Sequence, residues 1–387
     1  MTVVRLPTAG GGVEDYRPGP ASPYPATAAG AFPRTVYAAA HVVADPRSAA
    51  PPWQAAAVDW DTTMAFRRHL WGLGLKVAEA MDTSQRGMGF DWPTALELIR
   101  RSVAEARTIP GADLACGAGT DHLDPSPVLS LADVTAAYEQ QVAAVEQAGG
   151  RIILMASRAL AACARGPDDY LQVYGRILEQ AREPVILHWL GAMFDPALAG
   201  YWGSDDVDAA MATCLRLIEG HTGKVEGIKV SLLEARHEIA MRRRLPAGVK
   251  MYTGDDFNYA ELIAGDEHGH SHALLGIFDT IAQAASAAMT RLAAGDIAAY
   301  RAILDPTVPL SRKVFEAPTQ YYKAGVVLVA WLNGLQDHFV MVGGMQSART
   351  AQHYADVFRL ADTARILTDP DRAARRMATL MTLHGID

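Results

Sequence analysis

The chain has 387 residues, half of them hydrophobic and one fifth charged, and its 35 Lys and Arg against 43 Asp and Glu give a formal net charge of −8. This composition is typical of a soluble globular protein and excludes a disordered, collagen-like or coiled-coil chain. The acidic balance also argues against nucleic-acid and anionic-membrane partners, because such partners bind basic surfaces that release counterions.

Residues 1–30 are rich in Gly, Pro, Ala and Thr and show neither the two-residue period of a strand nor the 3.6-residue period of a helix. This segment predicts an irregular surface arm, which could also serve as a contact between subunits. Arg5 is not followed by an apolar signal segment, and the longest apolar stretch, around 324–335, is too short to cross a bilayer. We therefore expect a cytoplasmic protein with no membrane partner.

Short apolar runs then recur along the chain, most of them separated by segments with helical periodicity such as 91–108 and 130–150. Parallel strands need such crossovers. Length alone leaves two or three domains open, but this alternation predicts an α/β fold, a (β/α)8 TIM barrel over residues 31–295. The eight candidate strands are 35–43, 76–81, 112–119, 151–157, 184–190, 225–233, 249–253 and 272–279.

Helix-end signals agree with this layout. Asp91 precedes Trp92 and Pro93, which predicts an N-cap, and Gly149 with Gly150 predicts a helix end. Beyond residue 280 the pattern is wholly helical, which predicts a helical bundle over 296–387 packed on the barrel. No Gly-x-Gly-x-x-Gly or P-loop motif follows a predicted strand, so dinucleotide and P-loop functions lose their main signal.

Cysteine usage gives no sign of a disulfide framework or a zinc knuckle. Cys116, Cys163 and Cys214 lie far apart and form no C-x-x-C motif. We expect them to be buried, reduced thiols.

Catalytic groups of such barrels lie at the carboxyl ends of the strands, so polar residues at the ends of the apolar runs are the first candidates. They are His41, Asp45, Asp82, Thr83, Ser84, Asp121, His122, Ser157, Arg158, His188, Lys229, Asp255, Asp256 and Asp279.

Lys229 stands out among these candidates. The chain has six lysines beside 29 arginines, and Lys229 lies within the apolar run VEGIKVSLL. Burial would disfavour its charged form and lower its pKa, which suits an amine that attacks a carbonyl to form a Schiff base. The alternative is a lysine that extends to the rim of the barrel or pairs with Glu226 or Glu234.

Gly227-Ile228-Lys229 on the sixth predicted strand, followed one strand later by Gly254-Asp255-Asp256, resembles the dihydrodipicolinate synthase and N-acetylneuraminate lyase family of class I aldolases. The resemblance extends over nearly the whole chain from about residue 31. It implies a barrel lyase that forms a homo-oligomer, dimer or tetramer. It also implies that Lys229 condenses with the ketone of pyruvate or a related 2-oxo acid, with no cofactor or metal.

The chain departs from the family in the loop that holds the substrate carboxylate. The family sequence Gly-Thr-Thr-Gly-Glu falls on Asp82-Thr83-Ser84-Gln85-Arg86. The resemblance implies that the backbone N–H groups of Thr83 and Ser84 hold the carboxylate. Asp82 would repel an anion unless Arg86 or Arg158 compensates for it.

Two tyrosine positions of the family are also replaced. The proton-relay tyrosine on strand five falls on His188, which titrates near neutrality and can move a proton, although a core histidine bonded to a carbonyl is the alternative. A tyrosine pair on strand four falls on Ser157 and Arg158, so an inter-subunit relay is not expected. Arg158 could bind a carboxylate or phosphate, or be a salt-bridged surface residue.

Two alternatives to a Schiff-base enzyme remain open. A divalent metal, in a sugar isomerase or class II aldolase, could be held by His268, His270 and His272 with Asp266 and Glu267 and the strand-end groups Asp121, His122 and His188. The sequence Asp-Glu-His-Gly-His is also typical of an ordinary turn. A barrel that only binds a ligand is the other alternative, and it predicts a salt-bridged Lys229.

The sequence thus favours a Schiff-base carbon–carbon lyase or hydro-lyase acting on a 2-oxo acid or a sugar-derived keto compound. Lys229 would form the iminium, and His188 would relay a proton with Thr83 or Ser84. True dihydrodipicolinate synthase or neuraminate lyase activity is not expected, because the family tyrosine and glycine-rich loop are missing. The residues expected to bind substrate are Asp82, Thr83, Ser84, Arg86, Asp121, His122, Arg158 and Asp255.

Overall fold

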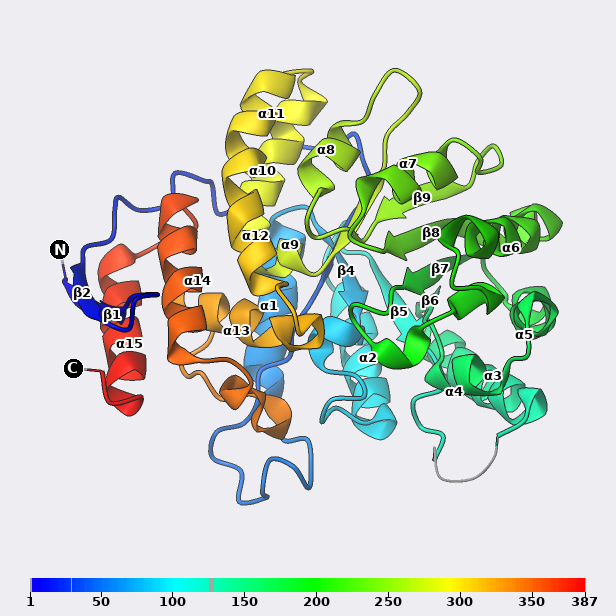
Figure 1. Ribbon diagram of the computed structural model, residues 1–387, viewed down its shortest axis with the longest axis horizontal. Coiled ribbons are helices and arrows are strands. Elements are labelled where there is room, and N and C mark those ends of the chain that lie inside the picture. Colours follow the sequence, from blue (N-terminus) through cyan, green and yellow to red (C-terminus); the bar gives the residue numbers. More distant parts are fainter. Residues whose placement is uncertain (1, 29, 125–128, 387) are drawn as a thin grey trace. The chain divides into compact units, whose positions relative to one another are not determined.

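Eight short parallel strands close into a barrel in the order β10-β3-β4-β5-β6-β7-β8-β9 (Figure 1). The computed structural model describes residues 2–28, 30–124 and 129–386; residues 1, 29, 125–128 and 387, which fall in the predicted arm, barrel and bundle, lie outside the described residues. Each predicted apolar run contains one strand, so the (β/α)8 prediction is confirmed. The strands are β3 Val36–Ala39, β4 Lys76–Glu79, β5 Leu114–Ala118, β6 Arg151–Leu154, β7 Val185–Leu190, β8 Val225–Ser231, β9 Lys250–Thr253 and β10 His272–Leu275.

Helices follow the strands in the chain, as parallel connections require. The predicted helix ends are confirmed: the Asp91 carboxylate accepts a hydrogen bond from the Thr94 N–H, and Gly149 adopts the left-handed conformation (φ 88°) that ends its helix. The helices are α1 Trp60–Gly72, α2 Trp92–Ala106, α3 Leu131–Ala148, α4 Arg158–Cys163, α5 Pro167–Gln180, α6 Val207–Gly220, α7 Ala235–Arg242, α8 Tyr259–Ala264, α9 Ile277–Thr280 and α10 Ala282–Ala293.

The barrel interior follows from the two-residue alternation of strands. Ile186 on β7 and Tyr252 on β9 belong to the buried cluster inside the barrel. Two residues beyond Ile186, His188 pairs in register with Lys229, and Lys229 in turn pairs with Tyr252. Because paired residues of parallel strands project to the same face, His188 and Lys229 both face inward.

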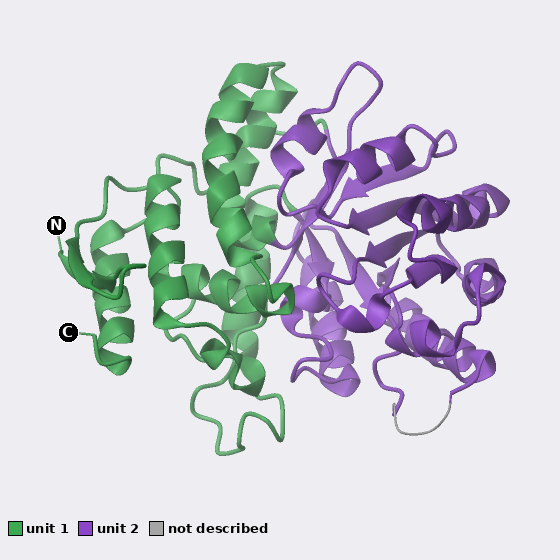
Figure 2. Ribbon diagram, in the orientation of Figure 1, with its two compact units in different colours: residues 1–33, 41–75, 277–387 green, residues 34–40, 76–276 purple. Residues whose placement is uncertain are grey.

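The chain divides into two compact units, coloured in Figure 2. Unit 2 comprises residues 34–40 and 76–276 and contains the whole barrel sheet; unit 1 comprises residues 1–33, 41–75 and 277–387. This division differs from the boundaries at residues 30 and 295 that the sequence suggested. One reason is that α9 packs on α13 (Tyr322–Leu332) and α10 packs on α11 (Ile297–Leu304), all within unit 1.

Unit 1 is mainly helical, as expected beyond residue 280. The longest apolar stretch of the sequence forms α13, whose residues are all buried. None of the helices in the part of the chain that the structure describes is long and apolar enough to cross a membrane. The remaining helices of this unit are α12 Val308–Val314, α14 Ala351–Thr363 and α15 Pro370–Leu383. Single 3₁₀ turns also occur, among them η1 Asp82–Ser84 and η2 Pro196–Leu198 in unit 2.

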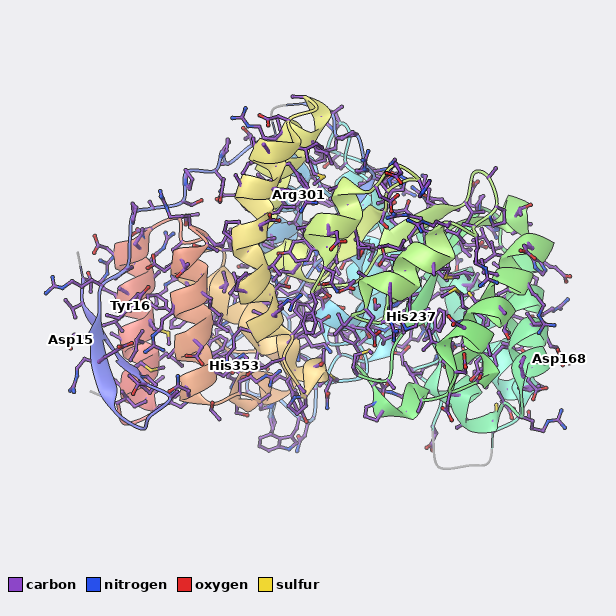
Figure 3. All side chains as sticks on the ribbon, turned by 45° about the horizontal axis from the view of Figure 1, so that its top comes forward. Asp15, Tyr16, Asp168, His237, Arg301 and His353 are labelled. Atoms are coloured by element: carbon purple, nitrogen blue, oxygen red, sulfur yellow. The ribbon has the colours of Figure 1, made fainter. Side chains whose placement is uncertain are left out.

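The N-terminal arm is not irregular throughout, contrary to the expectation. Strands β1 (Val4–Pro7) and β2 (Val13–Tyr16) form an antiparallel hairpin whose turn includes Gly11 with φ 81°. This hairpin is hard to recognise in the sequence, because its strands are only four residues long. In addition, β2 is largely exposed and lacks a buried apolar face. Tyr16, labelled in Figure 3, donates a 2.7 Å hydrogen bond to the Asp362 carboxylate of α14. The backbone N–H of Gly19 donates to the same carboxylate at 2.9 Å.

We expect Asp362→Ala to lower the free energy of unfolding by about 2 kcal/mol, because it leaves the Tyr16 hydroxyl and the Gly19 N–H without their charged acceptor. Urea unfolding measures the change. Asp168→Ala is the control, since the Asp168 side chain is 95% exposed. Equal effects of the two substitutions would contradict a role for Asp362 in anchoring the arm.

Candidate active site

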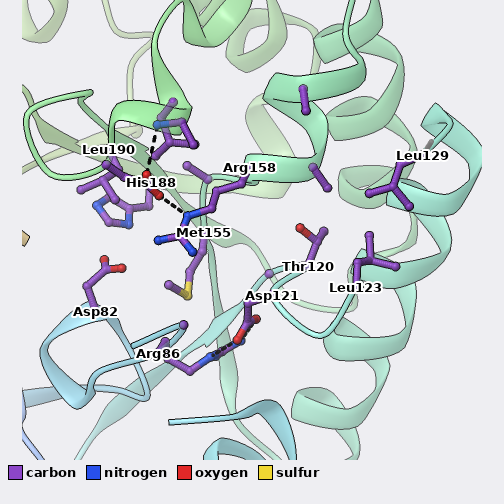
Figure 4. A pocket seen from close by; sticks show the side chains of 18 of the residues that line it. Asp82, Arg86, Thr120, Asp121, Leu123, Leu129, Met155, Arg158, His188 and Leu190 are labelled. Atoms are coloured by element: carbon purple, nitrogen blue, oxygen red, sulfur yellow. Dashed lines mark hydrogen bonds and ion pairs between the residues drawn. The ribbon is translucent and has the colours of Figure 1, made fainter. Parts of the chain in front are cut away.

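A cavity of about 960 Å³ opens at the carboxyl ends of β4 to β7, within unit 2 (Figure 4). The fold accounts for this position, because loops at this end of a barrel diverge and carry the polar residues. Its lining residues are Asp82, Arg86, Gly87, Gly119, Thr120, Asp121, Leu123, Leu129, Met155, Ala156, Arg158, Ala159, Ala162, Cys163, His188, Leu190, Asp195, Ala197 and Leu198.

Lys229 lies inside the barrel on the strand next to that of His188, is 7% exposed and does not itself line the cavity. Its Nζ forms no hydrogen bond or ion pair with another of the described residues. Burial lowers the pKa of Lys229, whereas the nearby carboxylates Asp82 and Asp256 raise it. The two acids that the sequence offered as partners are used elsewhere: Glu226 pairs with Arg151 and Lys250, and Glu234 pairs with Arg236.

His188 is the neighbour of Lys229 on β7 and lines the cavity. Its Nε2 lies 3.3 Å from the Ser231 hydroxyl of β8, and its buried Nδ1 has no hydrogen-bond partner among the described residues. Burial, and then the charge of Lys229, hold the pKa of His188 well below its usual range. The imidazole is therefore neutral at pH 7 and can accept a proton. It is not the carbonyl-bonded core histidine of the alternative reading.

The segment after β4 differs from the expected carboxylate loop. Ala80 has a φ of 52°, a conformation that is costly for a residue with a Cβ. Asp82 faces the cavity, but Thr83 and Ser84 are buried and do not line it. The Ser84 backbone N–H and hydroxyl both donate to the Met81 carbonyl, at 3.1 and 2.7 Å. Ser84 therefore has no donor left for a substrate.

Arg86 lines the cavity, yet its guanidinium is fully used by the protein. Nε and Nη2 bind the Asp121 carboxylate, Nη2 also donates to Gln141 Oε1 at 2.8 Å, and Nη1 donates to the carbonyls of Ala80 and Gly117 at 3.1 Å each. All five N–H donors thus have protein acceptors. Arg86 ties the β4 loop to the end of β5 and has no donor left for a substrate carboxylate.

Asp121 and His122 belong to the same hydrogen-bond network as Arg86 and Gln141. Burial would raise the pKa of Asp121, but the charge and hydrogen bonds of Arg86 outweigh it and lower that pKa. The His122 Nε2 lies 3.0 Å from Gln140 Oε1, and its Nδ1 lies 2.7 Å from Gln141 Nε2. His122 does not line the cavity.

Arg158, at the start of α4, remains open to the cavity. Its Nε forms an ion pair with Asp195, while Nη1 and Nη2 have no acceptor among the described residues. The side chain is 55% exposed and projects into the hollow shared with Asp82 and His188 (Figure 4). Of the two cationic lining residues, Arg158 is the one with donors available for an anion.

Asp255 closes the turn after β9 and does not line the cavity. Its carboxylate accepts hydrogen bonds from the N–H groups of Phe257 and Asn258 at 2.9 and 3.0 Å. The adjacent Asp256 is, with Asp82, one of the two acids whose charge raises the pKa of Lys229.

Three histidines of the metal alternative, His268, His270 and His272, lie at the other end of the barrel. His272 is the first residue of β10, and its Nδ1 accepts a 2.8 Å hydrogen bond from the Thr35 N–H. Asp121 and His122 follow the last residue of β5. Because the strands are parallel, His272 lies at the amino ends of the strands, whereas Asp121 and His122 lie at the carboxyl ends. These side chains are at opposite ends of the barrel and cannot share an ion. Within residues 2–28, 30–124 and 129–386, no three His, Cys, Asp or Glu side chains are placed to hold a metal.

Two residues around Lys229 have roles that the sequence did not indicate. Ser231 supplies the hydroxyl beside His188, and Gly254 leaves room for the lysine stem, since a Cβ at this glycine would lie 2.6 Å from Lys229 Cε. The alternation of β8 could have indicated Ser231, because Gly227, Lys229 and Ser231 share one face. Gly254 belongs to the Gly254-Asp255-Asp256 motif that resembles the family, but its role in leaving this space depends on the neighbouring strand.

Comparison with solved structures supports the fold. A dihydrodipicolinate synthase from Bacillus anthracis superposes with a TM-score of 0.62 at 16% identity, covering 84% of this chain and 97% of that one. A prophage protein of the dihydrodipicolinic acid synthase family from E. coli K12, in complex with pyruvate, gives a TM-score of 0.63 at 12% identity, covering 92% and 100%. The synthase from Aquifex aeolicus gives 0.60 at 11% identity, covering 91% and 98%. The chain therefore has the fold of dihydrodipicolinate synthases.

Sequence comparison adds one family. No curated protein matches the chain. One family model matches residues 4–386, and the chain belongs to that family, described as "Protein of unknown function (DUF993)".

Proposed function

We propose that this protein is a lyase that forms a Schiff base between Lys229 and a 2-oxo acid, and that it breaks or forms a carbon–carbon bond or removes water. The observation that carries the proposal is the inward-facing Lys229, buried without an ion pair beside a neutral His188. A lysine that served only packing or charge pairing would have a counter-ion in contact. The fold shared with dihydrodipicolinate synthases, one of them bound to pyruvate, supports the same reading.

The first step joins the amine to the ketone. Neutral Lys229 Nζ attacks the carbonyl carbon of the 2-oxo acid and forms a C–N bond, giving a carbinolamine. The carbinolamine oxygen then leaves as water after taking up a proton, and the cationic iminium remains. Burial favours this sequence because it lowers the pKa of Lys229 and so increases the fraction of neutral amine.

The iminium is the electron sink for cleavage. His188, neutral and with Nδ1 unpartnered, accepts the proton of the substrate hydroxyl. The carbon–carbon bond breaks, its electron pair forms the enamine, and an aldehyde leaves. The enamine then takes up a proton at carbon, and water hydrolyses the iminium to release the shorter 2-oxo acid and free Lys229.

The substrate carboxylate is assigned to Arg158. Its two terminal nitrogens have no protein acceptor and face the cavity near His188. Two parallel N–H donors suit the bidentate geometry of a carboxylate. Arg158 thus takes the binding role that the sequence had assigned to the Thr83 and Ser84 backbone.

Replacing Lys229 tests the mechanism directly. We expect Lys229→Ala to abolish the covalent adduct that borohydride traps with pyruvate, while circular dichroism stays that of the folded protein. Intact mass followed by peptide mapping reads the adduct. Lys76→Ala, at the amino end of β4, is the matched control and should keep the adduct. An adduct that persists without Lys229, or lyase turnover that survives its loss, would refute the proposal.

The pH dependence of trapping tests the electrostatics of Lys229. The neutral amine reacts, so the trapping rate should rise with pH to a midpoint below the ordinary lysine pKa of 10.5. Because Asp82 raises the pKa of Lys229, Asp82→Asn should move this midpoint to lower pH. Initial rates with cyanoborohydride and saturating pyruvate measure it, with the exposed N-cap substitution Asp91→Asn as the control. An unchanged or higher midpoint in Asp82→Asn would argue against this coupling.

Arg158→Met tests the carboxylate assignment. We expect the pyruvate concentration for half-maximal trapping to rise about tenfold, with the maximal extent of trapping retained. A charge-assisted hydrogen bond contributes roughly 1.5–3 kcal/mol, and the half-exposed position of Arg158 places this contact at the low end of that range. Arg176→Met on α5, a 60% exposed arginine, controls for loss of charge. If both variants saturate like the original protein, the carboxylate binds elsewhere.

A further inference from the structure

The cavity has two ends of different chemistry. Asp82 and His188 lie at the inner end, with Arg158 beside them. Figure 4 shows Leu123 and Leu129 on the side away from Asp82 and His188. The apolar lining residues are Leu123, Leu129, Met155, Ala156, Ala159, Ala162, Cys163, Leu190, Ala197 and Leu198, of which Leu190 lies beside His188.

The polar groups between these ends are already paired within the protein. The Thr120 hydroxyl lies 2.6 Å from the Ser157 hydroxyl, which also accepts from the Leu160 N–H. Asp121 binds Arg86, and Asp195 binds Arg158. Among the described lining residues, the outer end therefore offers few hydrogen-bonding groups to a ligand.

The cavity is also larger than a small keto acid requires. Its volume of about 960 Å³ is at the upper end of the roughly 300–1,000 Å³ typical of pockets for drug-sized ligands. A three-carbon 2-oxo acid is small beside this volume, so the cavity has room for a longer substrate.

We infer that the part of the substrate distal to the keto acid is a hydrocarbon group, so that the aldehyde released or consumed is apolar and not a sugar. This inference rests on the proposed Schiff-base function. Burying apolar surface against the leucines and alanines favours such a group. The hydroxyls of a sugar would lose water there without gaining partners, which disfavours the polyhydroxylated analogue.

Calorimetric binding to the full chain tests the inference, with two ligands of equal carbon number as probes. 2-Oxohexanoate and 2-keto-3-deoxygluconate share the keto acid and differ in the hydroxyls of the remaining chain. We expect 2-oxohexanoate to bind more tightly. In the series from pyruvate to 2-oxooctanoate, each methylene should strengthen binding about fourfold until the apolar end is filled.

Two neighbouring alanines of α4 provide matched variants. Ala162 lines the cavity and Ala161 does not. Ala162→Asp should abolish the gain per methylene, and Ala161→Asp should keep it. Ala162→Asn repeats the test without added charge. Tighter binding of the sugar acid, or equal responses of Ala161→Asp and Ala162→Asp, would overturn the inference.

The test separates this inference from the proposed function. Calorimetry is repeated on Lys229→Met, in which no covalent bond can form. A chain-length preference in this variant supports the apolar site even if borohydride traps nothing in the original protein, in which case only the Schiff-base function fails. Trapping at Lys229 with no chain-length preference leaves the function standing and refutes the apolar substrate.

Discussion

The candidate site depends on one electrostatic constraint, an amine held inside a closed sheet without a counter-ion in contact among the residues that the structure describes. The structure meets this constraint by keeping the neighbours of Lys229 uncharged or at a distance. His188 is neutral, Ser231 is a hydroxyl, and Gly254 leaves space for the lysine stem. Asp82 and Asp256 act on Lys229 only through their charge. Burial disfavours the cationic form of such an amine relative to an amine in water. The fraction of neutral amine, which is the form that attacks a carbonyl, is therefore larger.

The loop after β4 shows how two arginines of one cavity can have different tasks. Arg86, which falls on the glutamate of the family sequence, directs its donors to Asp121, Gln141 and two carbonyls. That network holds the loop in place and leaves Arg86 no donor for a ligand. Arg158 keeps Nη1 and Nη2 without an acceptor among the described residues. Under the proposed function, Arg86 therefore positions the loop and Arg158 binds the substrate carboxylate.

The lining of the cavity differs along its length. Burial lowers the pKa values of Lys229 and His188, which lie on the side of Asp82. Leu123 and Leu129 lie on the side away from Asp82 and His188 (Figure 4). Under the proposed function, charge would recognise the keto acid, and apolar contact would recognise the remaining group.

The sequence alone determined the eight strands and their closure into a parallel barrel, because apolar runs and helical periodicity are local patterns. It also located the strand ends that carry polar residues. Tertiary structure decided which of those residues are available. Arg86 and Asp121 carry suitable groups, but they bind each other across two loops that lie 35 residues apart in the chain. Ser84 and Asp255 instead pair within their own turns, with groups two or three residues away. His268, His270 and His272 precede β10 or begin it, at the end of the barrel opposite to Asp121 and His122. The Arg86–Asp121 pair and the space around Gly254 join residues far apart in the chain, so only the folded structure shows them.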